Sequence, residues 1–253
     1  MKILISGGEG LLAQHIIRAS IISRTKHKFI ILTHNQMNVR NHGEVLRAVS
    51  LHKPDVFLHC AAMTIPMDNH NYWQGMSINT NIIGSAVPAI VCHNSGGRTR
   101  LVYISTDFVY PGTDGYYTEQ SPLQPINNYA KSKLAGEMAA QMLPNSLILR
   151  CAFTECPFRH PKAFIDCFKS YLYADMAAVF ILELINSGYA GVVNVGGNRS
   201  TVYDFAKESR PDVGKITRAE VGTWIPRDIS MVTLLMQRIL KNDPTLQYPE
   251  RRD

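Results

Sequence analysis

The residues best placed to do chemistry are Tyr129 and Lys133, which lie four positions apart in a stretch that reads as a helix, residues 128–137. A spacing of four puts both side chains on one helical face, one turn apart. An ammonium group beside a phenol favours the phenolate, so we expect Lys133 to lower the pKa of Tyr129 from its usual value of about 10. Such a tyrosine can exchange a proton near neutral pH. Alone, the pattern also fits an amphipathic surface helix.

A third candidate, Thr106, follows the apolar run 101–105, and Asp107 comes directly after it. Ligands of doubly wound sheets gather at the carboxyl ends of strands. Thr106 is therefore placed to hydrogen-bond a substrate oxygen. Serine, threonine and aspartate also favour strand-end turns, so a structural role fits the same residues.

A glycine turn near the start of the chain predicts a dinucleotide site. Residues 2–6 read as a buried strand, and residues 14–18 have helical character. Strand, glycine turn and helix in this order are the context of a dinucleotide fingerprint. Gly7 would allow the tight turn, Gly10 would let the backbone approach a pyrophosphate at the helix amino terminus, and Ala13 would permit close packing. The residues expected to line a cofactor here are Gly7, Gly10, Leu11 and Leu12.

Strand and helix signals alternate along the rest of the chain. Strands are expected at 2–6, 29–33, 55–60, 101–105, 146–150 and 191–195, and helices at 42–51, 76–93, 128–137 and 174–187, with a capped helix start at 201–204. This alternation implies right-handed crossovers and a parallel sheet buried by helices on both faces. The predicted fold class is α/β, a doubly wound parallel (Rossmann) sheet with a small C-terminal substrate-binding subdomain.

We expect residues 1–150 to form an NAD(P)-binding core. Residues 171–198 are expected to return to this core and form part of it. Residues 151–170 and 199–253 are expected to form the small substrate-side region. The polar tail after Lys241 is expected to be loosely ordered.

Composition narrows the class of protein. With 253 residues, 45% hydrophobic and 18% charged, the chain has the profile of a soluble globular protein. We find no apolar run approaching the ~20 residues that span a bilayer, so no membrane partner is expected. The apolar stretch at the start is too short for a signal peptide. Five scattered cysteines without a CxxC pair predict reduced thiols, a cytoplasmic location and no zinc site.

The net charge of +6 is dispersed rather than gathered in a stripe, so no nucleic-acid partner is expected. A basic cleft would suit a ligand carrying phosphates, such as a dinucleotide or a nucleotide-sugar. The nine histidines show no metal-ligand spacing, and no metal is predicted.

Together these features resemble an extended short-chain dehydrogenase/reductase, with closer likeness to the dTDP-4-dehydrorhamnose reductase branch. The most specific part is 104–137, with Thr106, Tyr129 and Lys133. Three shorter stretches add to it: Cys60-Ala61-Ala62 is similar to the family's Asn-Ala-Ala, 81–85 to its Asn-x-x-Gly-Thr, and 226–231 to its substrate-side motif. The likeness is dense over 1–150 and thinner over 171–231.

The chain also departs from the family pattern. Ala13 replaces a glycine, and Phe108 and Phe153 stand where tyrosine and tryptophan, respectively, are frequent. Val232 stands where the family has an aspartate after Ser-Met or Ser-Leu. The stretch between Phe153 and Tyr171, which normally helps to wall the sugar site, is much shorter.

The resemblance implies reduction of the 4-keto group of a nucleotide-linked 6-deoxyhexose, in rhamnose or related deoxysugar biosynthesis. Tyr129 would donate the proton to the developing alkoxide, Lys133 would also hydrogen-bond the nicotinamide ribose, and Thr106 would hold the keto oxygen. Further cofactor-binding residues would be His34, Asn38, Val39, Cys60, Ala61, Ala62 and Asn81. Substrate-binding residues would be Thr106, Asp107, Phe108, Phe153 and Arg227, the last at a pyrophosphate.

The end of the second predicted strand favours NADPH over NADH. An acidic residue there would accept the ribose hydroxyls and repel a 2′-phosphate. Residues 33–36 contain no carboxylate, and Arg40 could reach a phosphate.

Alternative functions remain open. One is an epimerase/reductase acting on a UDP-linked sugar, because the nucleotide base cannot be read from these residues. Another is an NADP-binding regulatory subunit without turnover, which the short stretch after Phe153 allows. The expected partners are a nucleotide-sugar and a second copy of the chain in a homodimer.

Overall fold

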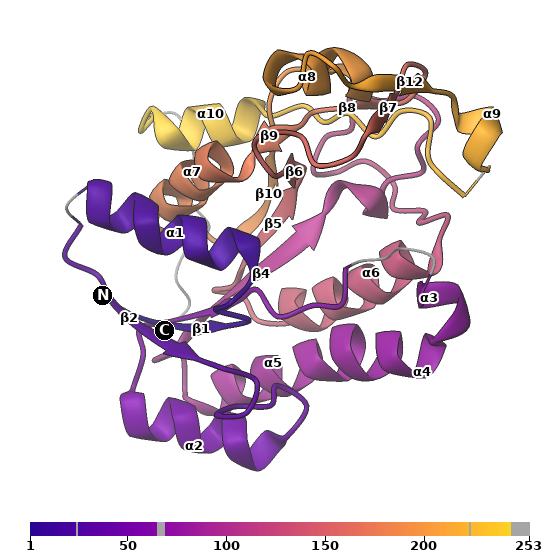
Figure 1. Cartoon of the computed structure of the whole chain (residues 1–253). Helices are drawn as coiled ribbons and strands as arrows, with labels where there is room; N and C mark the ends of the chain where they lie inside the picture. The colour runs from indigo at the N-terminus through magenta and orange to yellow at the C-terminus, as the bar shows by residue number, and fades with distance from the viewer. Residues whose placement is uncertain (24, 65–68, 223, 244–253) are drawn as a thin grey trace.

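A six-stranded parallel sheet forms the centre of the protein (Figure 1). The computed structural model describes residues 1–23, 25–64, 69–222 and 224–243. The strands lie in the order β10-β5-β4-β3-β1-β2, and every pairing between neighbours is parallel. Their bounds are β1 Lys2–Ser6, β2 Lys28–Leu32, β3 Val56–His59, β4 Arg100–Thr106, β5 Leu147–Cys151 and β10 Gly191–Val195. The predicted α/β fold class is confirmed.

Helices cover both faces of this sheet. On one face lie α1 (Leu11–Ile22), α7 (Ala174–Ser187) and α10 (Leu234–Leu240). On the other lie α2 (His42–His52), α5 (Gly84–Asn94) and α6 (Asn128–Gln141), as Figure 1 shows. Successive strand residues point to opposite faces, so Ile3 and Ile5 pack with α1 and α7 whereas Leu4 packs with α2 and α5. Burial on both faces explains the almost continuous apolar strands.

The topological switch point of the sheet lies between β1 and β3. The chain runs from β1 outward to β2 and then returns to the other side of β1 at β3. Ligands of doubly wound sheets bind outside the carboxyl ends of the strands at such a point. The glycine turn after β1 and the Thr106 end of β4 both lie at this edge.

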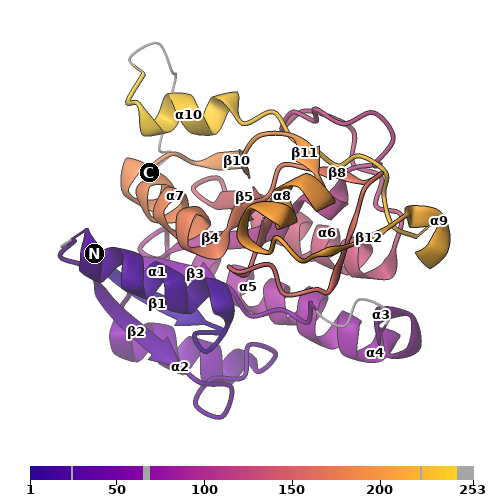
Figure 2. The same ribbon diagram turned by 45° about the horizontal axis from the view of Figure 1, so that its top comes forward.

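A smaller set of elements stands beyond the carboxyl ends of the strands, above the sheet in Figure 1. It contains three two-stranded pairings, β6–β9, β7–β12 and β8–β11, formed by Phe153–Thr154 with Leu172–Tyr173, Lys162–Phe164 with Gly214–Ile216, and Phe168–Lys169 with Ser200–Thr201. Helices α8 (Val202–Ser209) and α9 (Arg218–Val221) complete it, as Figure 2 shows from a second angle. The division of the chain into a core and a substrate-side region stays a prediction.

Element boundaries differ slightly from those expected from sequence. Strand β2 begins one residue earlier, and the helix expected at 76–93 runs through α4 (Gln74–Ser77), η1 (Ile78–Ile83) and α5. Short helices α3 (Asn69–Tyr72) and η2 (Asp107–Val109), and helix α10, were not predicted. The helix start at Thr201 is confirmed, since its hydroxyl accepts a hydrogen bond from the Asp204 amide at 3.0 Å. Of the tail after Lys241, residues 244–253 lie outside the described residues.

One sequence expectation needs correction. Residues Gln74–Asn94 form a continuous 21-residue helix, in which an 18-residue window has a mean hydropathy of 1.3. By length and composition alone it is long and apolar enough to cross a membrane. Interspersed residues such as Asn79 and Asn81 hide this apolar character from a search for uninterrupted runs. In the structure the helix packs on α2, α6 and strands β3 and β4, as a core helix of a folded domain does.

A buried ion pair ties α6 to the sheet. Arg150 on β5 donates to Glu137 on α6 at 2.6 Å, and both side chains are almost fully buried. The same guanidinium donates to Tyr110 Oη and to the Glu119 carbonyl, each at 3.0 Å. Ser105 on β4 donates to the other carboxylate oxygen of Glu137. This network fixes α6, and with it Tyr129 and Lys133, relative to the end of β4.

Gly136 lets α6 approach the neighbouring helix closely. A Cβ atom there would lie 2.6 Å from Tyr103 Oη, 2.7 Å from the Asn81 carbonyl oxygen and 2.8 Å from Ser85 Oγ. No side chain is accommodated at such distances without movement of α6 or η1.

We expect Gly136→Ala to destabilise the protein by about 1–3 kcal/mol, the cost of overpacking a well-packed interface. The matched control is Gly75→Ala on exposed helix α4, where a new Cβ has no neighbour within 4 Å. That control should be neutral or stabilising by about 0.4–1 kcal/mol. Urea unfolding of both variants measures the difference. Equal loss of stability in the two would contradict close packing at Gly136.

Candidate active site

The structure brings Thr106, Tyr129 and Lys133 together at the carboxyl end of β4. All three are buried, with exposed fractions of 5%, 9% and 4%. Thr106 and Lys133 both act on the Tyr129 phenol, and each lowers its pKa. Lys133 Nζ donates to the Ile104 carbonyl at 2.7 Å and lies 4.3 Å from the centre of the Tyr103 ring. The surface-helix interpretation of Tyr129 and Lys133 is therefore wrong, because this helical face packs on the sheet.

The start of α6 determines where Tyr129 stands. Asn127 caps the helix, since its side-chain oxygen accepts from the Ala130 amide at 2.9 Å. An asparagine in this position satisfies one of the free amides of the first turn. The helix must then begin at Asn128, so Tyr129 lies in its first turn and Lys133 one turn later, both toward β4.

The pKa of Tyr129 departs from the sequence expectation. Burial raises the pKa of Tyr129 and outweighs the lowering by Lys133, so the net direction is upward. Lys133 lowers the pKa of Tyr129, as expected. The sequence spacing of these two residues does not reveal, however, that both lose their contact with water on burial. Burial likewise lowers the pKa of Lys133, and Tyr129 is the largest opposing influence. The tyrosine is therefore held as a protonated phenol at neutral pH.

Two aromatic rings enclose the Tyr129 ring. Phe108 meets it edge-on with ring centres 5.9 Å apart, and His70 does so at 5.2 Å. His70 is completely buried, and its Nδ1 lies 2.7 Å from Ser77 Oγ. Burial lowers the pKa of His70, so this ring is neutral. Sequence reasoning missed His70, because a lone histidine before an apolar helix gives no signal of its own.

Asp107 lies beside this group, but its carboxylate is already engaged. One oxygen accepts from Thr106 Oγ1 at 3.1 Å, and the other lies 3.0 Å from Lys169 Nζ. Lys169 was not predicted as a site residue. It belongs to the short strand β8, and nothing in its neighbourhood in the sequence indicates a buried lysine.

The glycine turn after β1 has the geometry expected of it. Gly7 has a φ of +68°, and a Cβ there would lie 2.7 Å from the Ala61 backbone. Only glycine fits such a left-handed and crowded position. Gly10 precedes the first residue of α1 and donates its amide to the Gly7 carbonyl at 3.0 Å. Leu11 is exposed at the start of α1, and Leu12 is buried in the core.

Residues after β3 lie next to this turn. Cys60 and Ala61 are half-buried, and burial raises the pKa of Cys60 to about 12 although Lys133 opposes it. Ala62 follows and is also half-buried. The buried His59 packs between Ser6 Oγ at 2.7 Å and Ser85 Oγ at 3.1 Å, and burial lowers its pKa to about 3. Cys60 is thus an unreactive thiol, and His59 is part of the core.

Asn81 connects three parts of the site. It lies in η1, a stretch of π-helix, and is buried. Its amide exchanges hydrogen bonds with both backbone groups of Met63, at 2.8 and 2.9 Å, and donates to Ser132 Oγ on α6 at 2.8 Å. Asn81 fixes the chain after β3 against the helix that carries Tyr129.

The region after β2 exposes polar side chains. His34 and Arg40 are exposed, Val39 is buried, and Arg40 Nε donates to Asn38 Oδ1 at 3.0 Å. A carboxylate that sequence reasoning did not weigh, Glu44, accepts from the Asn38 amide at 2.7 Å. It also accepts from the Asn41 side chain, which caps α2. This carboxylate is occupied by the cap of α2.

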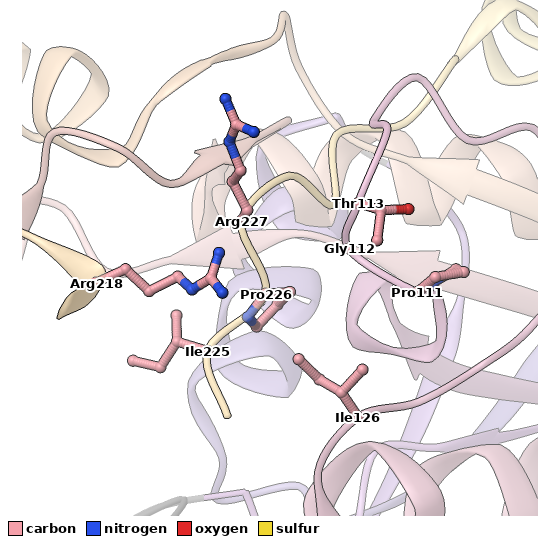
Figure 3. Close-up of a pocket in the computed structure, with 8 residues that line it drawn as sticks. All are labelled: Pro111, Gly112, Thr113, Ile126, Arg218, Ile225, Pro226 and Arg227. Carbon is pink, nitrogen blue, oxygen red and sulfur yellow. The ribbon is translucent and has the colours of Figure 1, made fainter. Parts of the chain in front are cut away.

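Arg227 lines a pocket that, among the described residues, contains none of Thr106, Tyr129 and Lys133. The pocket has a volume of about 350 Å³, and Figure 3 shows that Arg218 reaches toward Pro226 whereas Arg227 points away from Ile126. The predicted Phe153 is half-buried on β6 and packs against the main core.

A second pocket, of about 630 Å³, opens beside the start of α1. Its walls come from Leu11 and His15 of α1 and from the segments 155–159 and 209–212. The segment expected to be shorter than in the family therefore lies next to the glycine turn.

A doubly wound parallel sheet with a glycine turn after β1 and a threonine–tyrosine–lysine group at β4 defines an extended short-chain dehydrogenase/reductase fold. Comparison with known families makes this more specific. The family model described as "RmlD substrate binding domain" matches residues 1–164, and the chain belongs to this family.

Relatives and solved structures agree with this assignment. A dTDP-4-dehydrorhamnose reductase of Aggregatibacter actinomycetemcomitans is 26% identical over 60% of this chain and 51% of its own length. Methionine adenosyltransferase 2 subunit beta of Xenopus laevis is 31% identical over 54% of this chain and 42% of its own. The structure of a dTDP-4-dehydrorhamnose reductase from Bacillus anthracis in complex with NADP superposes with a TM-score of 0.83 at 22% identity, covering 98% of this chain and 95% of that one. The chain spans about half the length of the curated relatives it matches.

Proposed function

We propose that the chain catalyses NADPH-dependent reduction of the 4-keto group of a nucleotide-linked 6-deoxyhexose. This is the kind of reaction that the name of its dTDP-4-dehydrorhamnose reductase relatives describes. The observation that carries the proposal is the buried group of Thr106, Tyr129 and Lys133 at the carboxyl end of β4. Family membership over residues 1–164, which include all three, supports it.

The residues of the glycine turn fit a dinucleotide. Gly7 allows the chain to turn against Ala61 where any Cβ would collide, and Gly10 leaves the amino terminus of α1 free of a side chain. Helix amino termini favour phosphate groups. The residues that would hold the cofactor are those of the turn, the stretch Cys60–Ala62 and Lys133.

When bound, a reduced nicotinamide would supply the hydride, while the protein supplies orientation and electrostatics. Tyr129 holds the proton that the sugar oxygen needs as it becomes an alkoxide. Since its raised pKa keeps the phenol protonated at neutral pH, it is in the form required for reduction. Lys133 stabilises the phenolate left after proton transfer. The Thr106 hydroxyl, which donates to Asp107 in the structure, would turn its proton to the keto oxygen as charge develops there.

The pocket of Figure 3 is a candidate for the nucleotide end of the substrate. Two arginines, Arg218 and Arg227, stand at a wall of isoleucine and proline side chains. An arginine fork suits phosphate oxygens. We assign Arg227 to the substrate pyrophosphate on this ground, and Phe108 and Phe153 to the sugar side.

For cofactor choice we expect a higher kcat/KM with NADPH than with NADH. Loss of a charged hydrogen bond between Arg40 and the 2′-phosphate, worth about 1.5–3 kcal/mol, should raise KM for NADPH about tenfold or more in Arg40→Ala. KM for NADH should not change. Arg47→Ala, an exposed arginine on α2, is the matched control. A strong preference for NADH in the unmodified protein would refute the choice of NADPH.

A regulatory subunit is the second candidate function, because one relative is named as the beta subunit of a methionine adenosyltransferase. Measuring NADPH consumption with dTDP- and UDP-linked 4-keto-6-deoxyhexoses distinguishes the two functions. Turnover supports the reductase, and the preferred base separates a dTDP-sugar from a UDP-sugar enzyme. Tight NADP binding with no turnover of either sugar supports the regulatory subunit.

We extend the proposal to a cytoplasmic location and a homodimer. Five free cysteines, four of them buried or half-buried, suit a reducing compartment. Size-exclusion chromatography with light scattering measures the assembly directly.

A further inference from the structure

Lys169 is a buried lysine that the proposed reaction does not yet use. It ends strand β8, and its side chain is only 8% exposed. Its Nζ lies 3.0 Å from Asp107 Oδ2, 4.1 Å from the centre of the Phe108 ring and 4.4 Å from that of Tyr171. One carboxylate and two aromatic faces therefore replace the water around this ammonium group.

The backbone that carries Lys169 is fixed on both sides. Phe168 donates its amide to the Arg227 carbonyl at 2.8 Å and accepts from the Ile229 amide at 3.1 Å. On the other edge, Lys169 pairs with Ser200 of β11. Because β8 is held between these segments, the position of the ammonium group is determined by the fold.

Asp107 transmits this position to Thr106. Its other oxygen, Oδ1, accepts the Thr106 hydroxyl at 3.1 Å. A threonine hydroxyl has one proton, so while it is donated to Asp107 the oxygen can only accept from other groups. The Phe108 amide donates to that oxygen at 3.3 Å. Thr106 also acts on the Tyr129 phenol and lowers its pKa. The direction of the Thr106 proton thus depends on the position of the Asp107 carboxylate.

The charge of Asp107 also depends on Lys169. The titratable groups that act on Asp107 or are acted on by it are Lys169, Tyr129 of α6 and Cys151 of β5. Burial raises the pKa of Asp107, and Lys169 is the largest influence that opposes it. Burial alone would lower the pKa of Lys169, but Asp107 outweighs it and the net direction is upward. Each group thus shifts the pKa of the other toward its charged form.

We propose that Lys169 is a positioning residue that holds the Asp107 carboxylate against Thr106 and neutralises its charge beside the reacting oxygen. This inference rests on the proposed reductase function. Without Lys169, an anion next to a developing alkoxide would oppose the reaction, and the Thr106 hydroxyl would be held more strongly by Asp107.

The test compares kcat as a function of pH in Lys169→Met, Lys169→Arg and the unmodified protein. In Lys169→Met the pKa of Asp107 rises further. At pH values below this pKa Asp107 is a neutral acid, and at pH values above it Asp107 is an anion without a compensating charge. We expect kcat of this variant to be lower by about 10²-fold at the alkaline end and to recover as pH falls, because one oriented donor is worth about that factor. Lys169→Arg should keep the pH profile of the unmodified protein. A Lys169→Met profile parallel to the unmodified one would overturn the proposal.

A second measurement does not depend on turnover. Infrared difference spectra should show the carbonyl stretch of a protonated carboxylic acid near neutral pH in Lys169→Met, but not in the unmodified protein or in Asp107→Asn/Lys169→Met. Lys131→Met, at an exposed position of α6, is the control for loss of a lysine. If the unmodified protein reduces no keto sugar, the reductase function fails while this measurement still decides whether Lys169 sets the state of Asp107. Absence of the band in Lys169→Met would overturn that role.

Discussion

Tyr129→Phe is expected to lower kcat by about 10²–10⁴-fold, the usual contribution of a positioned general acid. The change removes only the hydroxyl. The ring contacts with His70 and Phe108, which hold the side chain in place, are retained. NADPH consumption with a 4-keto-6-deoxyhexose nucleotide measures kcat, and fluorescence titration with NADPH should show that cofactor binding is retained.

The matched control for this prediction is Tyr72→Phe. Tyr72 is 77% exposed on α3, so loss of its hydroxyl should leave kcat unchanged. Equal activity of Tyr129→Phe and the unmodified protein would remove Tyr129 from the mechanism and with it the proposed role of Lys133.

Arg150→Met is expected to destabilise the protein by about 3–5 kcal/mol, the cost of leaving a buried charge without its partner. Glu137 is completely buried and would keep only the hydrogen bonds from Ser105 and Gln141. The loss should also reduce activity, because Glu137 and Lys133 lie one turn apart on α6. Urea unfolding at constant m-value measures the change.

Two further variants compare the loss of an exposed ion pair with the loss of this buried one. Arg159→Met removes an arginine from an exposed pair with Glu155 at 3.6 Å, which should cost at most about 1 kcal/mol. The double variant Arg150→Met/Glu137→Leu should recover much of the stability lost in Arg150→Met, since no buried charge remains uncompensated. A double variant less stable than Arg150→Met would contradict this account of the network.

The order of elements could be predicted because each strand carries its own local signal. Residues 2–6, 101–105 and 191–195 are short apolar runs bounded by glycine or polar residues, and each became a strand of the main sheet. Helix α10 could not be predicted in the same way. It is only seven residues long, and it is stabilised by the burial of Met236 and Ile239 against α7 and β10 rather than by its own pattern.

The candidate site could be predicted only in part. Tyr129 and Lys133 were found because helical spacing places them on one face. The direction of the Tyr129 pKa was wrong, because spacing reveals a neighbouring charge but not the loss of water that opposes it. Lys169 and His70 reach the site through tertiary packing alone.

The segment expected to differ most from the family pattern contributes directly to the site. It lies between Phe153 and Tyr171 and includes β7 and β8. Its lysine, Lys169, pairs with Asp107 beside Thr106, and its residues 155–159 wall the pocket at the start of α1.

Transfer of deuterium from NADPH labelled at C4 of the nicotinamide tests the central claim most directly. With a dTDP-linked 4-keto-6-deoxyhexose, we expect the unmodified protein to form a product that carries deuterium at C4 of the sugar, detected by mass spectrometry and NMR. Tyr129→Phe should form almost none in the same time. NADP binding without deuterium at C4 of either the dTDP- or the UDP-linked sugar would contradict the account.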